Sequence, residues 1–178
     1  MKSVCLLRAV NVGGRKASAA ELRAMAAELG FEGAQTLLAS GNLVLDPGKL
    51  AGAELEAALE AAFEARFGFF TEFMCRTAAQ WRTLLEACPF PEAARVAPSR
   101  LLAFVPKAAP ATDAVERLRA LAQDGEQVER AGDVIWIWFD AGVGTSKLST
   151  ARGGKAFGAA VTARNHNTVV KLAALAEA

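Results

Sequence analysis

The chain has 178 residues, of which 53% are hydrophobic and 22% are charged, and its formal net charge is +1. This composition excludes a disordered or collagen-like chain, and no run of about 20 apolar residues is present that would cross a membrane. The apolar start of the chain is interrupted at Arg8 and Asn11, before a signal peptide would be complete. We therefore expect a cytoplasmic globular protein of one large or two small domains.

The charge is distributed unevenly along the chain. Residues 1–20 carry a net charge of +4 and residues 141–178 also carry +4, whereas residues 21–140 carry −7. Several of the basic residues fall in predicted loops, which favours a local positive field that would attract an anionic partner. The alternative is that acidic residues simply dominate the exposed faces of the helices.

The first half of the chain predicts alternating strands and helices. Ser18 and Glu21 have the spacing of a capping box and predict the start of a helix that ends at Gly30. The tripeptide Ser-Gly-Asn at residues 40–42 is typical of a tight hairpin turn. In chain order we predict a strand over residues 4–8, this helix, strands over 36–39 and 43–45, a helix over 51–66 and a strand over 69–76.

The second half of the chain repeats this order. Thr77 and Gln80 begin a further helix that ends near Cys88, and prolines then mark a linker over residues 89–99. Both halves have the order β-α-β-β-α-β, which predicts an α+β fold made by tandem duplication of ferredoxin-like units with extra helices, in domains 1–88 and 100–178. The elements predicted after the linker are a strand over 101–105, a helix over 112–121, strands over 126–130 and 134–139, a helix over 146–157, a strand over 160–163 and a helix over 167–176.

This topology predicts where the polar loops lie. The first and second strands of such a unit run in the same direction, so the loop over residues 11–16 is expected beside the turn at 40–42. In the second half, the loop over 142–146 and the strand end at 164–165 are expected to share the opposite edge of the sheet. The glycine-rich polar segments would then form two clusters.

The first cluster has the pattern of an anion-binding loop. A strand, a loop with Gly13 and Gly14, and a helix N-terminus expose backbone N–H groups that favour negative charge. Arg8, Arg15 and Lys16 add positive charge nearby. The spacing is not that of a Walker A loop. The alternative is that the two glycines only supply the positive φ angles of a turn.

The second cluster precedes the last helix. Arg164 beside two amides could hold a phosphate or a carboxylate, or could form a salt bridge with the acidic middle of the chain. One of Asn165 and Asn167 is expected to be the helix N-cap. We expect His166 to be solvated rather than catalytic. The candidate ligand-binding residues of both clusters are Arg8, Asn11, Gly13, Gly14, Arg15, Lys16, Ser40, Asn42, Lys147, Arg164, Asn165, Asn167 and Lys171.

The tryptophans Trp136 and Trp138 share one face of a predicted strand. With basic residues nearby, such a face could stack nucleic-acid bases or bind a protein. The alternative, which we favour, is that it packs against the first domain or a partner subunit. The glutamates at positions 54, 56, 60 and 64 are expected on a solvated helix face.

The cysteines and the histidine indicate neither a redox motif nor a metal site. Cys5, Cys75 and Cys88 have no C-x-x-C spacing, and we expect them to be buried thiols. A lone histidine, without a Cys/His cluster, argues against a transition metal. No catalytic residue and no cofactor is identified, so whether the protein is an enzyme stays open.

Four segments resemble the motifs of one bacterial family. Residues 6–16, LLRAVNVGGRK, resemble a signature of the form LLRGINVGGK, and residues 40–42 resemble its SGN hairpin. Residues 146–148 and 162–172 resemble its SKL and TxRNWNTxxKL segments. The chain thus resembles the "domain of unknown function 1697" family over nearly its whole length, with Ala9 in place of a glycine and His166 in place of a tryptophan. The resemblance implies a fold and a candidate site but no activity.

We therefore hypothesise that the protein binds a small anionic ligand, a phosphorylated metabolite or a nucleotide, at its basic Gly/Asn-rich loops. The alternatives are a non-enzymatic nucleic-acid-binding module and a protein–protein interaction domain that uses the face of Trp136 and Trp138.

Overall fold

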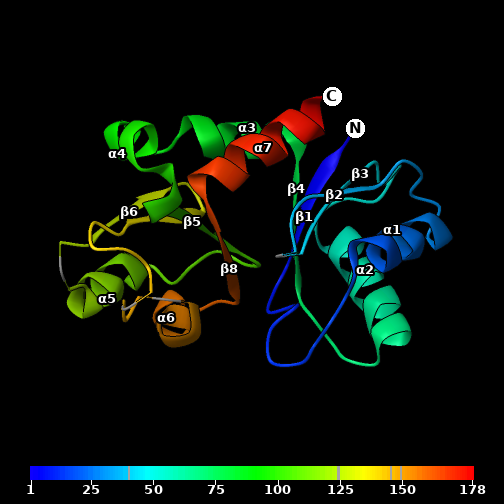
Figure 1. The fold of residues 1–178 in the computed structure, drawn as a ribbon, viewed down its shortest axis with the longest axis horizontal. Helices are drawn as coiled ribbons and strands as arrows, with labels where there is room; N and C mark the ends of the chain where they lie inside the picture. The colour runs from blue at the N-terminus through cyan, green and yellow to red at the C-terminus, as the bar shows by residue number, and fades with distance from the viewer. Residues whose placement is uncertain (40, 124, 145, 149) are drawn as a thin grey trace. The chain divides into compact units, whose positions relative to one another are not determined.

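The chain folds as an α+β protein with two four-stranded antiparallel sheets (Figure 1). The computed structural model describes residues 1–178 except 40, 124, 145 and 149, and the side chains of residues 150–153 also lie outside the description. The strand order is β2-β3-β1-β4 in the first sheet and β6-β7-β5-β8 in the second. In each sheet the strand that comes first in the chain is central, and it pairs with the third and fourth strands of its set.

The helices and strands occur in the predicted order, although β4 and α6 each begin four residues later than predicted. In the first half they are β1 (Ser3–Leu7), α1 (Ala19–Glu28), β2 (Gln35–Thr36), β3 (Asn42–Leu45), α2 (Gly52–Phe67), β4 (Phe73–Thr77) and α3 (Ala78–Glu86). In the second half they are α4 (Pro91–Val96), a 3₁₀ turn (Pro98–Arg100), β5 (Leu101–Pro106), α5 (Ala114–Leu121), β6 (Gln127–Ala131), β7 (Val134–Trp138), α6 (Thr150–Phe157), β8 (Val161–Asn165) and α7 (His166–Glu177).

Two differences from the predicted elements have local causes. Residues 89–99, predicted as a linker, contain α4 and a 3₁₀ turn, because Pro91 and Pro98 each stand in a first turn, where proline's fixed φ suits a helix. The second strand ends at Thr36 instead of residue 39, because Leu38 has a φ of 59°, which no strand residue adopts.

The chain divides into two compact units with bounds that differ from the predicted domains. The first unit contains Met1–Arg82 together with Leu172–Ala178, and the second contains Thr83–Lys171. The division therefore falls inside α3 and inside α7. Within the first unit, the end of α7 contacts the start of the chain, since Lys2 Nζ donates to the Leu175 carbonyl at 3.4 Å.

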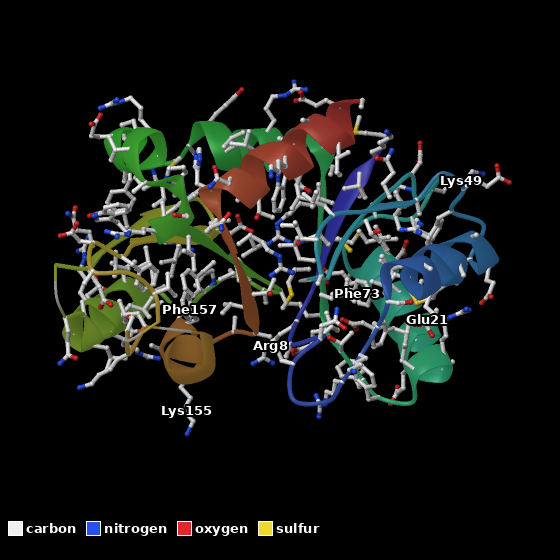
Figure 2. All side chains as sticks on the ribbon, viewed as in Figure 1. Arg8, Glu21, Lys49, Phe73, Lys155 and Phe157 are labelled. Atoms are coloured by element: carbon white, nitrogen blue, oxygen red, sulfur yellow. The ribbon has the colours of Figure 1, made fainter. Side chains whose placement is uncertain are left out.

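The core of each unit lies between its sheet and two helices. In the first unit, α1 and α2 cover the face of the sheet that carries Leu7 and Phe73, and the Phe63 and Phe73 rings meet at 5.9 Å. In the second unit, Phe157 of α6 points toward the sheet and stacks on Phe104 at 5.1 Å, whereas Lys155 points away (Figure 2). Burial of each such side chain contributes about 1.5–3 kcal/mol.

The outer edge of β4 is closed by side chains. Glu60 Oε1 accepts the Phe73 N–H at 2.9 Å, and Glu56 Oε1 accepts the Cys75 N–H at 2.9 Å. At the end of the strand, Gln80 Oε1 accepts the N–H of Thr77 at 2.9 Å, at the helix start that the sequence predicts for these two residues. The expectation that the α2 glutamates are all solvated was wrong for Glu56. Its side chain is buried because its carboxylate accepts the Cys75 N–H at the edge of the sheet.

Candidate functional site

The end of β1 and the β2–β3 connection meet at one edge of the first sheet. β1 and β2 both pair antiparallel with β3, so they run in the same direction and end at the same edge, as predicted. Two hydrogen bonds join the segments: Asn11 Nδ2 donates to the Ala39 carbonyl at 2.6 Å, and the Leu7 N–H donates to the Gly41 carbonyl at 2.9 Å. The first predicted cluster is therefore brought together.

The two glycines of the first cluster form a tight turn. The Arg15 N–H donates to the Val12 carbonyl at 3.1 Å, and Gly13 and Gly14 have φ angles of 57° and 84°. Two successive positive φ angles are what a type I′ two-residue turn needs. Both glycines thus have a structural role.

The two asparagines of this cluster hold loops in place. Asn11 Oδ1 accepts the Ala17 N–H at 3.0 Å, and its Nδ2 donates to the Ala17 carbonyl at 3.2 Å, in addition to the bond to Ala39. Asn42 is 1% exposed, and its Nδ2 donates to the Leu37 carbonyl at 2.7 Å. Ser40, the remaining predicted residue of the hairpin, lies outside the described residues.

A pocket opens between these two segments at the start of α1. Its volume is about 450 Å³. Ser18 caps the helix there, and its hydroxyl accepts the Glu21 N–H at 3.2 Å while Glu21 Oε2 accepts the Ser18 N–H at 3.1 Å. The lining residues are Asn11, Ala17, Ser18, Ala19, Leu22, Thr36, Leu38, Ala39 and Gly41. Sequence reasoning missed Thr36 and Leu38, which carry no signal of a polar site.

The charged side chains around this edge are not equivalent. Arg8 Nη1 pairs with Glu72 Oε2 at 2.6 Å, so its charge is neutralised locally. The Arg15 guanidinium lies over the Phe69 ring at 5.7 Å, and Lys16 is exposed. Hydrogen bonds from Ser18 lower the pKa of Glu21, so this carboxylate stays ionised beside the helix start.

Arg23, a basic residue that sequence reasoning did not select, also reaches this edge. Its Nη1 donates to Thr36 Oγ1 at 2.8 Å, and Thr36 lines the pocket. From the sequence we selected basic residues in predicted loops, and Arg23 was missed because it lies within the helix α1.

Unusual backbone conformations concentrate at this edge. Within the described part of the chain, the non-glycine residues with positive φ are Ala9 at 53°, Asn11 at 58° and Leu38 at 59°. Asparagine tolerates this region, but alanine and leucine are strained there. The φ of Ala9 also explains the glycine of the family signature at that position. Such strain is typical of functional sites.

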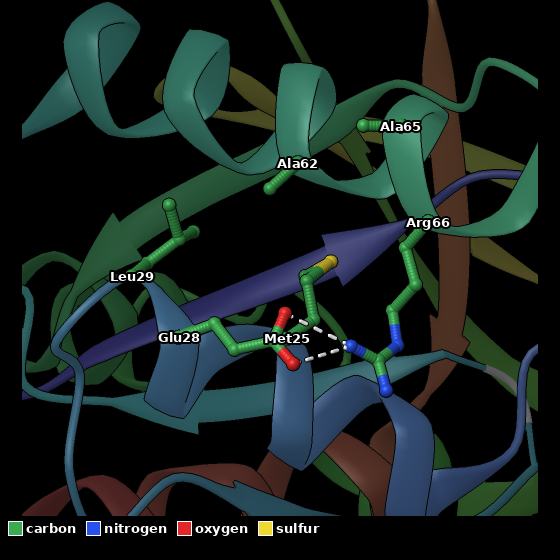
Figure 3. A pocket seen from close by; sticks show the side chains of 6 residues that line it. All are labelled: Met25, Glu28, Leu29, Ala62, Ala65 and Arg66. Atoms are coloured by element: carbon green, nitrogen blue, oxygen red, sulfur yellow. Dashed lines mark hydrogen bonds and ion pairs between the residues drawn. The ribbon is translucent and has the colours of Figure 1, made fainter.

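A second pocket lies between α1 and α2, and both apolar side chains and the charged side chains of Glu28 and Arg66 line it. Its volume is about 340 Å³, and Met25 lies within it (Figure 3). The pocket is bordered by an ion pair in which Arg66 Nη1 contacts both carboxylate oxygens of Glu28, at 2.8 and 2.9 Å. No predicted site residue lines it.

The second predicted cluster has mainly structural contacts. Asn165 Oδ1 accepts both the N–H and the hydroxyl of Thr168 at 3.0 Å, so Asn165, and not Asn167, caps α7. Lys147, Asn167 and Lys171 are exposed. This cluster belongs to the second unit, whereas the first cluster belongs to the first unit.

Arg164 is buried in the second sheet. It is 6% exposed, and its Nη1 donates to Thr162 Oγ1 and to the Ala163 carbonyl, each at 2.8 Å. Burial lowers the pKa of Arg164 to about 10, so the guanidinium is still charged at neutral pH. The Arg164 side chain therefore donates hydrogen bonds to two residues of its own strand, β8.

Trp136 lies in the same row of the second sheet. Ala103 of β5 pairs with both Trp136 and Arg164, which places the three residues side by side across the sheet. Trp136 is 0% exposed, its ring lies 6.0 Å from that of His166, and its Nε1–H has no acceptor within the described part of the chain. A buried indole cannot stack a base, as the nucleic-acid alternative would require, whereas Trp138 is half-buried.

Neither a metal-binding cluster nor a membrane-spanning helix is present among the described residues. No three His, Cys, Asp or Glu side chains among them are grouped as a metal site would require. None of the helices in the described ranges combines the length and the apolar character that crossing a bilayer requires.

Comparison with known proteins places the chain in a family. The model of the DUF1697 family, described as "Protein of unknown function (DUF1697)", matches residues 1–136. The chain belongs to the DUF1697 family. The match includes the motifs at 6–16 and 40–42, and it ends before those at 146–148 and 162–172.

A solved structure has the same fold as this DUF1697 chain. It is that of conserved bacterial protein SP0830 from Streptococcus pneumoniae, with a TM-score of 0.77 and 20% sequence identity. The alignment covers 99% of this chain and 98% of that chain. At this identity the similarity shows the fold alone. No curated protein matches the sequence significantly.

Proposed function

We propose that this protein binds a small anionic ligand, a phosphorylated metabolite or a nucleotide, in the pocket at the start of α1. The observation that carries this proposal is the position of the pocket at the N-terminus of α1. The wall includes the first helical residue, Ala19, and follows directly on the loop that carries Arg15 and Lys16. The strained backbone of Leu38, on the opposite side of the same pocket, supports a functional role for this edge.

The electrostatics of the pocket favour an anion. The first N–H groups of a helix have no acceptor within the helix, and the helix dipole adds partial positive charge there. Ser18 accepts the N–H of Glu21, and among the described residues no acceptor is found for the N–H groups of Ala19 and Ala20, which are therefore available to a ligand. Lys16 and Arg15 supply positive charge on the adjoining loop, Arg15 from its position over the Phe69 ring, and the Glu21 carboxylate opposes this charge.

The proposal uses the first cluster only. Arg164 and Asn165 of the second cluster have contacts that support β8 and α7. In the first cluster, the side-chain amides of Asn11 and Asn42 hydrogen-bond to the backbone and hold the loops in place. We do not propose that these amides contact the ligand.

The test is binding of small anions, measured by thermal unfolding at low salt and by calorimetry. The probes are inorganic phosphate, nucleotides, sugar phosphates, simple carboxylates and a short single-stranded RNA. An anion at about 100 times its dissociation constant adds about 2.7 kcal/mol to the free energy of unfolding. We expect one small anion to raise the midpoint, and the Arg15→Gln/Lys16→Gln double variant to bind it at least about tenfold more weakly.

The matched control is Lys49→Gln. Lys49 is an exposed lysine of the same unit, on the loop after β3, and we expect its variant to bind like the unaltered protein. The proposal is wrong if no small anion raises the midpoint, or if the double variant binds the anion as well as Lys49→Gln does. A shift with RNA alone that fades with salt would replace it with nucleic-acid binding.

For the fold, we propose that the two sheets derive from duplicated ferredoxin-like units. The equivalent strand orders of the two sheets support this proposal, because in both the first strand lies between the third and the fourth. Superposition of the two halves in an experimental structure is the test. Failure of the four strands of one half to superpose on those of the other would refute it.

A further inference from the structure

Cys5 and Cys75 face each other across neighbouring strands. The register of the first sheet pairs Cys5 of β1 directly with Cys75 of β4. Both side chains belong to the core beneath α1 and α2, where Cys5 is 0% and Cys75 5% exposed. Both thiols are free. The sequence predicts inert buried thiols, and it gives no indication that the two residues are partners, because 70 positions separate them.

The hydrogen bonds of β4 show which kind of antiparallel pair this is. The Cys75 N–H donates to Glu56 and so does not point toward β1. The Phe73 N–H, two residues earlier, donates to Glu60 in the same way. Cys5 and Cys75 are therefore a non-hydrogen-bonded pair, the kind in which opposing Cα atoms lie about 4.5 Å apart. Disulfides span Cα distances of about 4.4–6.8 Å, so the pair meets this requirement without movement of the strands.

The two thiols also contact each other. Burial is the main reason why the pKa of Cys75 is raised, and a hydrogen bond with the Cys5 thiol raises it further. Because directly opposed residues of an antiparallel pair project from the same face of the sheet, the two side chains are neighbours in the core.

We infer that Cys5 and Cys75 form an oxidation site, in which a low-molecular-weight disulfide such as glutathione disulfide converts the two thiols into a disulfide between β1 and β4. One cysteine thiolate attacks a sulfur of glutathione disulfide and releases one glutathione thiolate. The second cysteine thiolate then attacks the mixed disulfide and releases the other glutathione. The two cysteines lose two electrons and two protons, and glutathione disulfide is reduced to two molecules of glutathione.

The fold delays this reaction without preventing it. A thiolate is the attacking species, burial raises the pKa of the Cys75 thiol, and both thiols are shielded from solvent, so the intact core is unreactive. β4 is an edge strand, so oxidation takes place when β4 opens or while the chain folds. The resulting bond closes a long loop of the chain and stabilises the fold by restricting the unfolded state.

The test uses equilibrium refolding, so that burial does not block the reaction. The Cys88→Ser variant is unfolded in urea and refolded in buffers of increasing glutathione disulfide to glutathione ratio, and remaining thiols are then alkylated. We expect the refolded chain to lose the mass of two hydrogens without an adduct, and peptide mapping to recover a Cys5–Cys75 bridge. The oxidised chain should keep its native circular dichroism and unfold at a higher temperature than the reduced chain.

Two variants provide the controls. Cys5→Ala and Cys75→Ala, each in the Cys88→Ser background, retain one thiol and should show no loss of two hydrogens at any ratio. The inference is overturned if the two-cysteine chain keeps both thiols alkylatable at the most oxidising ratio. It is also overturned if the oxidised chain unfolds at a lower temperature than the reduced one, since the disulfide would then strain the strands.

Discussion

The side-chain amide of Asn11 donates to the Ala39 carbonyl at 2.6 Å and so joins the loop after β1 to the β2–β3 connection. The same side chain exchanges two hydrogen bonds with the backbone of Ala17, at the entrance to α1. One residue thus fixes three segments around the candidate pocket, and its φ of 58° is one that asparagine tolerates.

Asn11→Ala should lower the free energy of unfolding by about 2–4 kcal/mol, since it removes three hydrogen bonds and places alanine in the left-handed region. Asn11→Gly loses the same hydrogen bonds but keeps the conformation, so its loss should be smaller. Urea unfolding measures both. Equal losses would show that the backbone conformation contributes nothing.

Ala9→Gly should raise the free energy of unfolding by up to about 1 kcal/mol, because the φ of Ala9 is 53° and glycine adopts this angle without strain. The control is Ala57→Gly, at an exposed position within α2, which should lower it by about 1 kcal/mol. The same chemical change is thus expected to have opposite signs at the two positions. A loss of stability at both would contradict the assigned strain.

Gly41→Ala should be severely destabilising. A Cβ at Gly41 would lie 2.5 Å from Val10 Cγ2 and 2.9 Å from Leu7 Cβ, and the φ is 73°. The expected loss is about 1–2 kcal/mol from the backbone and a further ~1–3 kcal/mol from overpacking. Gly48→Ala separates the two effects, since Gly48 has a φ of 61° but no atom within 4 Å of its Cβ position. If urea unfolding gives the two variants similar losses in the free energy of unfolding, overpacking at residue 41 does not contribute.

Stability should fall in mild acid partly because of His166. Burial lowers its pKa in the folded chain, so the unfolded chain binds the proton more tightly. His166 therefore makes its full contribution to the free energy of unfolding above its pKa in the unfolded chain, about 6.5. This contribution is lost as the pH falls below that value. Urea unfolding at pH 7.5 and 5.5 should show a smaller decrease for His166→Gln than for the unaltered chain. An equal decrease would assign the pH dependence to other groups.

Glu60→Ala should speed amide hydrogen exchange at Phe73, because the Phe73 N–H loses its acceptor at the sheet edge. Oxidation of the folded Cys88→Ser chain should accelerate in parallel, if opening of β4 exposes Cys75. Glu64→Ala, on the same helix but exposed, is the matched control and should leave both rates unchanged. Unchanged exchange at Phe73 in Glu60→Ala would contradict the assigned role.

The order of strands and helices was predictable because it depends on local signals. The capping box of Ser18 with Glu21 and the helix start at Thr77 and Gln80 are confirmed, and so is the position of the 11–16 loop beside the β2–β3 connection. Each follows from residues close in sequence or from the direction of a strand.

What the sequence left open depends on contacts between distant residues. Glu56 looks like any glutamate on an amphipathic helix, and only its distance to Cys75 of β4 identifies its role. Burial of Arg164 likewise depends on what covers that face of the sheet, which strand periodicity does not report. The anion-binding pattern of the glycine loop was ambiguous, because a tight turn and a phosphate cradle use the same residues.

The closed edge of β4 has a consequence for assembly. A strand whose N–H groups are unoccupied is a template on which a strand of another molecule can add, and repeated addition leads to fibrils. Glu60, Glu56 and Gln80 occupy the donors of residues 73, 75 and 77, so a neighbouring molecule finds none to pair with there. These acceptors therefore end the growth of the first sheet on that side, and a chain that has lost them would be prone to polymerise through β4.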